Sequence, residues 1–270
     1  MRQWRLIYDI PAAGAWNMAI DESLMESVGA GQSPPTLRLY SWNPPCLSLG
    51  YGQRFAEVDF TSADLLGWDV VRRPTGGRAI LHTDELTYSL SLPANDDLAA
   101  GTIVESYQRI SLALLAGLIY LGAAPRADQR PEHIEVSSVC FETPSHYEIT
   151  VDGRKLVGSA QTRRKNAILQ HGSLPLWGDI ARICNGLLFP DDAARLSAEE
   201  HVRQRALTLA DALGHEIVWL EAADAVAQGF AETFDVDFQN YEATLTDLEY
   251  DRAQQLMSDV YATPEWTRRR

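Results

Sequence analysis

From Ser137 to Leu176 the chain reads SSVCFETPSHYEITVDGRKLVGSAQTRRKNAILQHGSLPL, and this stretch organises the rest of the sequence. Apolar and polar residues alternate from 147 to 151, which is the period-two pattern of a β-strand. Asp152-Gly153 follows, a tight-turn dipeptide between strand-like residues, so we expect a hairpin. A third strand follows the return strand. The resulting meander would bring Cys140, just before the first strand, close to Lys155 on the second.

Outside this stretch, strands dominate before residue 176 and helices dominate after it, which is the order of an α+β protein. The length of 270 residues and the 46% hydrophobic content allow one large domain over residues 1–270. We expect its core over about 31–245 and a C-terminal helical extension over about 246–270. Further strands are expected at 4–8 (an edge strand), 36–42, 46–51, 69–73, 85–92 and 167–170.

Helix boundaries are indicated by capping residues. Asn17 and Thr102 are placed to cap helices at 17–28 and 101–121. Ser197 with Glu200, and Thr246 with Glu249, have the spacing of a capping box. These signals and the apolar periodicity predict later helices at 179–187, 197–213, 221–234 and 246–261.

Composition excludes several function classes. The net charge of −14 and the pI of about 4.8 argue against nonspecific binding to nucleic acid. There is no apolar run of about 18 or more residues and no signal-peptide core, so we expect no membrane span and a cytoplasmic protein. Three scattered cysteines form neither a disulfide framework nor a CxxC pair, so no metal site is expected. Cys46 and Cys184 are expected to be buried in the core.

Positive charge is concentrated locally. Two of the 23 basic residues are lysines, Lys155 and Lys165, and both fall in the central stretch. Lysine is a compact point charge that fits into a narrow site beside a nucleophile. The pKa of a lysine also shifts more readily than the pKa of an arginine. Two basic groups, 72–78 and 154–165, flank motifs and predict a basic mouth for an acidic partner, whereas 268–270 reads as solvated surface charge.

A second motif, RRPTGGRAILH, occupies residues 72–82. Gly76-Gly77 allows the backbone to come close to a ligand, and its amides are suited to an oxyanion, carboxylate or phosphate. The motif lacks the GK[ST] of a P-loop and the spacing of a dinucleotide fingerprint. A plain hairpin turn is the alternative interpretation.

Cys140 is a candidate nucleophile, and attack of its thiolate on an acyl group is one chemistry that these residues could carry. Cys140 needs a nearby cation to form a thiolate, and Lys155 across the hairpin is the natural candidate. The backbone at Gly76-Gly77, or at the small residues Gly158-Ser159, is suited to stabilise an oxyanion. The histidines at 82, 146 and 171 are alternative bases or structural hydrogen-bonding groups.

Two segments carry a family resemblance: RRPTGGRAILHTDELTYS, and VCFETPSHYEITVDGRKLVGSAQTRRKNAILQHGSLPL. Together they resemble the lipoate-protein ligase A and biotin ligase catalytic-domain family, and CFETPSHYE resembles its LipM-type octanoyltransferases. The NMAIDESLM segment and the final PEW extend the resemblance over most of the chain. It implies a mixed β-sheet flanked by helices, with no cofactor.

The resemblance also implies a reaction, transfer of octanoyl from octanoyl-acyl-carrier protein to a lysine of a lipoyl-domain protein such as the glycine cleavage H protein. By position, Cys140 matches the cysteine that forms the acyl-thioester, and Lys155 matches the lysine that lowers its pKa. The wall of the acyl pocket corresponds to Arg73, Gly76, Gly77 and His82. His146 occupies a position where an aromatic residue is expected.

Three other functions stay open at this point. An ATP-dependent lipoate ligase would use Lys155 and the glycine turn for an acyl-adenylate, although the chain is short for a ligase with an accessory domain. An amidotransferase would move octanoyl between lipoyl-domain proteins with the same cysteine and lysine. A noncatalytic lipoyl-domain binding protein would not depend on the thiol.

Overall fold

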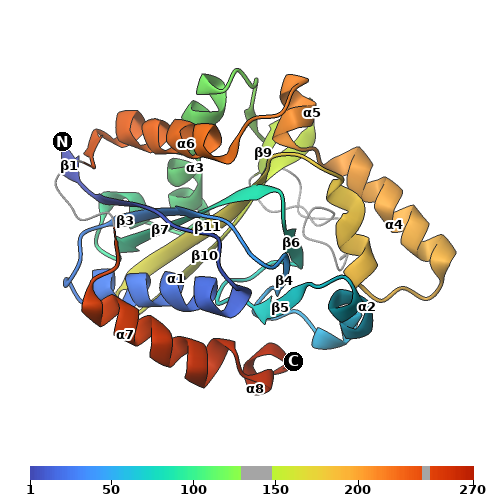
Figure 1. The fold of residues 1–270 in the computed structure, drawn as a ribbon. Coiled ribbons are helices and arrows are strands. Elements are labelled where there is room, and N and C mark those ends of the chain that lie inside the picture. Colours follow the sequence, from blue (N-terminus) through green and yellow to red (C-terminus); the bar gives the residue numbers. More distant parts are fainter. Residues whose placement is uncertain (129–147, 239–243) are drawn as a thin grey trace.

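The computed structural model describes residues 1–128, 148–238 and 244–270 (Figure 1). A mixed sheet of seven strands runs through the centre, in the order β2-β3-β7-β11-β10-β9-β8. Only β2 and β3 pair in parallel within it; the other neighbours are antiparallel. The strands are β2 Arg5–Tyr8, β3 Thr36–Tyr40, β7 Glu85–Pro93, β8 Arg126–Asp128, β9 Glu148–Val151, β10 Arg154–Arg164 and β11 Ala167–Pro175.

Two smaller sheets complete the β structure of the described residues. One has the order β5-β4-β6 and lies beside the large sheet; the other pairs β1 with β12. The expected strands are present, and the first is an edge strand as predicted. The bounds are β1 Arg2–Gln3, β4 Cys46–Leu49, β5 Asp69–Arg72, β6 Ile80–His82 and β12 Val236–Asp237.

Helices cover both faces of the seven-stranded sheet (Figure 1). The helices α3 (Ile103–Tyr120) and α6 (Trp219–Phe234) lie on one face, and α1 (Gly14–Gly29) and α7 (Asp247–Leu256) lie on the other. This arrangement confirms the expected α+β class and the mixed sheet flanked by helices. The remaining helices are α2 Phe60–Leu65, α4 Asp192–Arg205, α5 Leu209–Leu213 and α8 Pro264–Thr267, with 3₁₀ turns at Phe55–Glu57, Asp97–Ala99 and Ile180–Gly186 and a π turn at Met257–Tyr261.

The two faces of this sheet differ in chemistry although both are buried. On β7, four alternating residues, Leu86, Tyr88, Leu90 and Leu92, join the apolar core under α3 and α6. Their neighbours Glu85, Thr87, Ser89 and Ser91 are equally buried but polar, and they point toward the side of α1. A leucine-polar alternation usually marks a strand with one solvated face. Here the polar face is enclosed instead.

The predicted hairpin is confirmed. Asp152 and Gly153 have φ values of 51° and 73°, the left-handed conformation that a two-residue turn of the primed type requires. Val151 pairs with Arg154 across it. A second two-residue turn, Lys165-Asn166, leads into β11, so the three strands form the expected meander.

Two capping predictions are wrong. The helix α1 begins three residues before Asn17, and Asn17 is fully buried inside it. Its amide donates to the carbonyls of Ala12 and Ser41 at 3.1 Å each and accepts from Arg38 Nη2 at 2.8 Å. Asn17 therefore connects α1 to the sheet instead of capping a helix.

The pattern at Ser197 and Glu200 is also not a helix start. The side chain of Asp191 caps α4 by accepting from the amide of Ala194, one and a half turns earlier. The helix predicted at 197–213 is broken near Ala206, and α5 starts after a capping box formed by Thr208 and Asp211. The predicted cap at Thr102 and the predicted capping box at Thr246 are confirmed, and Thr102 also forms a capping box, with Glu105.

Candidate active site

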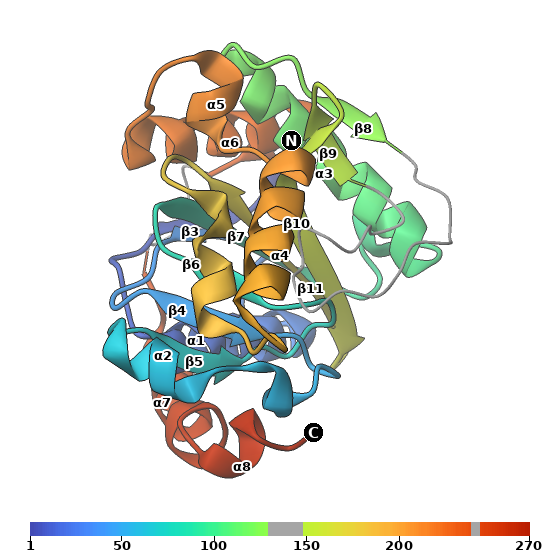
Figure 2. The same ribbon diagram turned by 90° about the vertical axis from the view of Figure 1, so that its right-hand side faces the viewer.

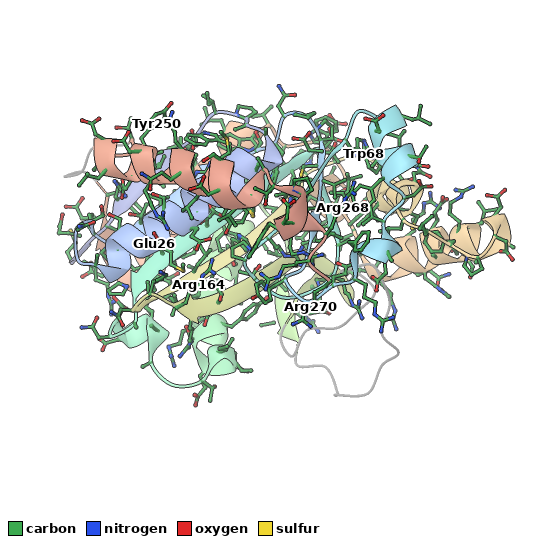
Figure 3. The ribbon with its side chains drawn as sticks, turned by 90° about the horizontal axis from the view of Figure 1, so that it is seen from below. Glu26, Trp68, Arg164, Tyr250, Arg268 and Arg270 are labelled. Atoms are coloured by element: carbon green, nitrogen blue, oxygen red, sulfur yellow. The ribbon has the colours of Figure 1, made fainter. Side chains whose placement is uncertain are left out.

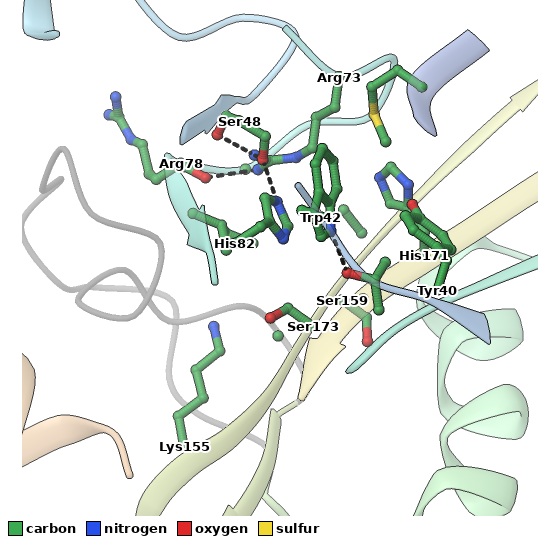
Figure 4. A pocket seen from close by; sticks show the side chains of 17 residues that line it. Tyr40, Trp42, Ser48, Arg73, Arg78, His82, Lys155, Ser159, His171 and Ser173 are labelled. Carbon is green, nitrogen blue, oxygen red and sulfur yellow. Dashed lines mark hydrogen bonds between the residues drawn. The ribbon is translucent and has the colours of Figure 1, made fainter. Parts of the chain in front are cut away.

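A cavity of about 160 Å³ lies between the seven-stranded sheet and the three-stranded sheet (Figure 4). Engineered apolar cavities of roughly 150 Å³ in proteins admit benzene, so this cavity has room for a hydrocarbon chain. Aromatic and aliphatic side chains, among them Tyr40, Trp42 and Ile80, form part of its wall. The lining residues that are at least partly exposed define its rim: Gly77, Arg78, Ser159 and Ala160.

Lys155 reaches this cavity because β10 contains a β-bulge. Thr150 pairs with Lys155 and Ile149 pairs with Val157, so Leu156 is an extra residue on β10. A bulge changes the direction of the side chains around it. Leu156 and Val157 are consequently both part of the apolar core, while Lys155 lines the cavity.

The ammonium group of Lys155 is held in a buried ion pair. Its Nζ lies 3.1 Å from Oε1 of Glu148, and both side chains are only 3% exposed. The backbone of Lys155 is fixed as well, because its carbonyl accepts from the amide of Leu207 at 3.1 Å. Gly158 lies alongside, where an added Cβ would be 3.4 Å from Lys155 Cε. The segment between α4 and α5 therefore supports the lysine from outside the sheet (Figure 2).

The turn at residues 74–78, here called the glycine turn, forms one wall of the cavity. The guanidinium of Arg73 donates to the carbonyls of Ser48, Gly76 and Arg78 at 2.9, 2.8 and 2.7 Å. Gly77 has φ +94°, which favours glycine. A Cβ on Gly50 would lie 1.9 Å from the carbonyl oxygen of Gly77, so this close backbone approach also requires glycine. The turn is thus a fixed shape.

His82 belongs to one buried hydrogen-bond network on the polar face of the sheet. Its Nε2 lies 2.8 Å from Ser48 Oγ, and its Nδ1 lies 2.8 Å from Glu85 Oε1. The imidazole stacks on the indole of Trp42, with ring centroids 4.0 Å apart. Glu85 also accepts from Thr87 and Ser173. Both nitrogens of His82 are occupied, which fixes the ring as part of the wall.

His171 belongs to a second network. Its Nε2 lies 2.6 Å from Thr75 Oγ1 in the glycine turn, and its Nδ1 lies 3.0 Å from Asp21 Oδ2 on α1. Burial lowers the pKa of His171, so the ring is neutral near pH 7. Burial would raise the pKa of Asp21, but the hydrogen bond to His171 and the charge of Arg38, 2.9 Å away, hold that pKa below its usual value. A neutral histidine between an anion and a hydroxyl serves as a rigid link between α1 and the glycine turn.

The structure brings most of the predicted site residues together. Six of them line the cavity: Arg73, Gly77, His82, Lys155, Gly158 and Ser159. Gly76 is not among the described lining residues, and its carbonyl accepts from Arg73 instead. The positions of Cys140 and His146 lie outside the described residues.

Several site residues were missed by sequence reasoning. Asp21, Glu85 and Glu148 are buried carboxylates that hold His171, His82 and Lys155 respectively. Asp21 and Glu85 sit in segments that read as an ordinary helix and an ordinary strand. The only signal in the sequence was the acidic residue within an otherwise apolar helical face at Asp21.

The predicted basic mouth at 154–165 is wrong as a single group. Arg163 lies eight positions beyond Lys155 along β10, a span of about 26 Å. At the far end of β10, Arg164 pairs with Glu22 and Lys165 pairs with Glu26. Lys155 alone of this group lines the cavity.

Cys46 and Cys184 lie in the apolar core, away from the lining of the cavity. Cys46 and Cys184 are both fully buried, as predicted, and burial raises the pKa of the Cys46 thiol well above its usual value.

Among residues 1–128, 148–238 and 244–270, no group of three or more His, Cys, Asp or Glu side chains is arranged to hold a metal ion. Within the same ranges, no helix has the length and apolar character needed to cross a membrane.

Comparison with known proteins adds to this geometry. Residues 13–231 match the family model of the lipoyl protein ligase A/B catalytic domain. The octanoyltransferase LipM of Kyrpidia tusciae is 42% identical over 277 residues that cover 100% of both chains. LipM of Bacillus subtilis is 37% identical over 99% of this chain and 98% of its own. A bipartite lipoate protein ligase from Thermoplasma acidophilum superposes with a TM-score of 0.82 at 26% identity, covering 99% of this chain and 97% of that one.

Proposed function

The chain belongs to the lipoyl protein ligase A/B catalytic-domain family, and from this premise we propose that it transfers octanoyl groups to lipoyl-domain proteins. It is an acyltransferase of protein lipoylation, because relatives that match its whole length at 37–42% identity are octanoyltransferases. The observation in the structure that supports this function best is the placement of a buried lysine beside a cavity with partly apolar walls.

The proposed mechanism uses Cys140 as the nucleophile. Its thiolate attacks the carbonyl carbon of an octanoyl thioester, a new carbon–sulfur bond forms, and the carbon–sulfur bond to the donor breaks. The donor leaves as a thiolate that takes up a proton. One thioester replaces another at similar free energy, so the step needs no ATP.

The second step passes the acyl chain to the acceptor. The neutral amine of the acceptor lysine attacks the Cys140 thioester, an amide bond forms, and the cysteine thiolate is released. The amine loses a proton in this step. Neither His82 nor His171 can accept this proton without rearrangement, because both ring nitrogens of each are already hydrogen-bonded. Water or the leaving thiolate is therefore our proposed proton acceptor.

Lys155 has two tasks in this mechanism. Its ammonium favours the thiolate form of a nearby cysteine and lowers the pKa of that thiol. It also offers a hydrogen-bond donor where negative charge develops on the acyl oxygen. The glycine turn and the segment Gly158-Ser159 also contribute to the lining of the cavity, and their backbone amides are our further candidates for stabilising this oxygen.

We propose octanoyl-acyl-carrier protein as the donor, a lipoyl-domain protein such as the glycine cleavage H protein as the acceptor, and the cytoplasm as the location. The extent of the functional unit, one domain over 1–270 with a core at about 31–245, is part of the same proposal. An ATP-dependent ligase is the second candidate, because the fold is shared with a lipoate protein ligase. The relatives with full-length matches favour the transferase.

The deciding experiment measures the intact mass of the protein after mixing with octanoyl-acyl-carrier protein in the absence of ATP. We expect an octanoyl adduct that hydroxylamine removes, that Cys140→Ser abolishes, and that passes to an apo lipoyl domain. Replacing the donor with an octanoylated lipoyl domain tests the amidotransferase. Modification of the acceptor only with octanoate and ATP would instead show a ligase.

A further inference from the structure

Five arginines gather beside the rim of the cavity, and we call them the arginine patch: Arg54, Arg78, Arg268, Arg269 and Arg270. They come from three distant parts of the chain. Figure 3 views the molecule from the side of α7 and α8 and labels Arg268 and Arg270. Four of the five are exposed, and Arg78 is partly exposed. The patch is unusual in a chain whose net charge is −14.

The C-terminal part of the patch is anchored, although its arginines are solvent-exposed. The buried guanidinium of Arg72 donates to the carbonyl of Thr267 at 2.8 and 3.1 Å, and the indole of Trp266 donates to the carbonyl of Arg72 at 2.8 Å. The carbonyl of Arg270 accepts from the amide of Phe55 at 2.9 Å. These bonds fix the backbone on which the three arginines stand.

Their guanidinium groups also pack on aromatic rings. Arg269 lies 4.4 Å from the ring centroid of Tyr51 and 4.6 Å from that of Trp266. Arg268 lies 5.5 Å from the ring centroid of Phe60. Stacked guanidinium groups lose less side-chain freedom when they bind an anion than free ones do. The patch is thus partly preorganised.

The segment 50–57 connects the patch to the cavity. The amide of Tyr51 donates to the carbonyl of Thr75 in the glycine turn at 2.8 Å. Arg78 belongs both to the patch and to the rim, and its Nη1 lies 3.5 Å from Glu57 Oε1. A partner held on the patch therefore stands next to the entrance of the cavity.

The patch keeps a positive excess. In the part of the chain that the structure describes, Glu57 is the one carboxylate side chain within 4.0 Å of a guanidinium of the patch. Burial and then the charges of Arg269 and Arg270 lower the pKa of Arg72 beneath them, which shows how closely the cations are placed. An acidic partner would relieve this repulsion.

We propose that the arginine patch docks the acidic carrier protein that delivers the acyl chain, an inference that rests on the proposed function. The donor attaches the acyl chain through a pantetheine arm whose phosphodiester is an anion, so both the arm and an acidic carrier surface suit the patch. The acceptor instead has to bring a lysine, a cation, to the same entrance. Positive charge at the rim opposes that approach.

The test compares two triple variants with equal charge change. The patch variant combines Arg54→Gln, Arg268→Gln and Arg270→Gln, which leaves the stacked Arg269 and the rim residue Arg78 in place. The control combines Arg163→Gln, Arg203→Gln and Arg252→Gln, at exposed or partly exposed arginines that bond to Gly101, Asp179 and Glu26. Acylation of the enzyme is followed by intact mass in single turnovers.

With octanoyl-carrier protein, we expect the patch variant to need about tenfold more donor for half-maximal acylation and to lose most of the salt dependence of the wild type. With octanoyl-pantetheine, which lacks both the carrier and the phosphate, the patch variant and wild type should acylate equally. The control variant should match wild type with both donors.

Other results would overturn the proposal. Equal loss with octanoyl-pantetheine would mean that the patch only supports the fold of the site. A defect confined to transfer from the octanoylated enzyme to the lipoyl domain would assign the patch to the acceptor. Unchanged kinetics would remove the patch from docking.

Direct binding separates this proposal from the proposed function. Fluorescence anisotropy of labelled carrier protein measures docking without chemistry. If no donor acylates the wild type, the transferase function fails, whereas weaker carrier binding by the patch variant than by the control would still support docking. Equal binding by all three proteins would contradict it.

Discussion

The two faces of the seven-stranded sheet are built from the same strands and are buried to the same degree, yet they do different work. Under α3 and α6, residues such as Leu39 and Leu90 pack into an apolar core. One position away on each strand, Arg38 and Ser91 lie on the face toward α1, where polar groups dominate. The apolar face stabilises the fold by removing hydrocarbon from water. The polar face carries the cavity.

The charged groups on the buried polar face are paired, whereas the hydroxyls of Ser89 and Ser91 have no hydrogen-bond partner among the described residues. Arg38 is fully buried and bonds to Asp9, Asp21 and Asn17. Glu85 bonds to His82 and two hydroxyls. Leaving one such group unpaired costs several kcal/mol, so the networks specify one arrangement of side chains. The site residues are therefore held rigidly, because this face can stay buried only while its charged groups keep their hydrogen-bond partners.

The largest expected effect follows from removing Lys155, the buried cation that lines the cavity. Lys155→Ala should slow acylation of the enzyme by about 10²- to 10³-fold, the loss seen when a preorganised charge-stabilising group is removed. Single-turnover intact-mass measurements give the rate. The matched control is Lys165→Ala, which removes the other lysine, whose side chain is 60% exposed at the far end of β10.

Circular dichroism and thermal unfolding should show that Lys155→Ala remains folded. An acylation rate within threefold of wild type in that folded variant would remove Lys155 from the mechanism. Lys155→Arg tests shape at constant charge: we expect it to stay slow as well, since a planar guanidinium does not fit the place of a compact ammonium beside Gly158.

Adjacent residues of β7 give the sharpest test of the two faces for stability. Leu90 is fully buried in the apolar core, and Leu90→Ala should lower the free energy of unfolding by about 2–5 kcal/mol. Ser89, on the other face, is 1% exposed, and its hydroxyl has no hydrogen-bond partner among the described residues. Ser89→Ala should change the free energy of unfolding by less than about 1 kcal/mol.

Urea unfolding at pH 7 measures both values. The proposed difference between the two faces would be contradicted if Ser89→Ala lowered the free energy of unfolding as much as Leu90→Ala does. That result would mean that the Ser89 hydroxyl has a role in the polar networks. Neither Ser89 nor Leu90 lines the cavity. Under conditions in which both variants are folded, acylation by octanoyl-carrier protein should therefore proceed at the wild-type rate.

The polar face should also make stability depend on pH. Burial lowers the pKa of His171, so below the ordinary histidine pKa of about 6.5 the unfolded chain binds a proton at this residue that the folded chain does not. The unfolded state is then favoured as the pH falls. We expect the free energy of unfolding to fall below pH 6.5 by at most about 1.4 kcal/mol per pH unit from this residue.

His171→Gln should flatten that part of the curve, measured by urea unfolding between pH 5 and pH 8. The exposed His215 is the control, and His215→Gln should keep the wild-type slope. Asp21 adds a second decline at lower pH, since its pKa is also held down in the folded state. An unchanged slope in His171→Gln would show that other groups govern the decline above pH 5.

Several local features of this molecule could be predicted from the sequence, although the caps at Asn17 and Ser197 could not, and the long-range features were out of reach. The turn at Asp152-Gly153 and the capping boxes at Thr102 and Thr246 are set by residues within four positions of each other, so they were predictable. The bulge at Leu156 was not, because it depends on how β9 pairs with β10. Strict alternation would have placed Lys155 and Val157 on one face.

The site shows the same limit. The family resemblance of the motif at 72–82 implied that Arg73, Gly77 and His82 form the wall of the acyl pocket, and all three line the cavity. The carboxylates that hold the site residues were not identified. Asp21 lies 150 residues from His171. Glu85 and Glu148 lie near His82 and Lys155 in the sequence, but each is one polar residue in a strand-like segment. A buried carboxylate is indistinguishable from an exposed one in the sequence until its partner is known. The cations at 163–165 were misassigned for the converse reason, since the length of β10 carries them away from the cavity.

The smallest expected effect on acylation tests whether the network of His171 supports the glycine turn. Thr75→Val keeps the shape of the side chain but removes the hydroxyl that bonds to His171 Nε2 at 2.6 Å. We expect a loss of about 1–3 kcal/mol in the free energy of unfolding, the cost of leaving the buried Nε2 of His171 without its partner. Because the hydroxyl holds the glycine turn and touches no reacting atom, the concentration of octanoyl-carrier protein for half-maximal acylation should rise a few-fold while the maximal rate stays within twofold.

Thr75→Ser, which restores the hydroxyl, should return both values toward wild type. A fall in the maximal rate with an unchanged donor requirement would contradict this role, since it would mean that the Thr75 hydroxyl acts on the chemical step and that the network of His171 is more than a support for the turn.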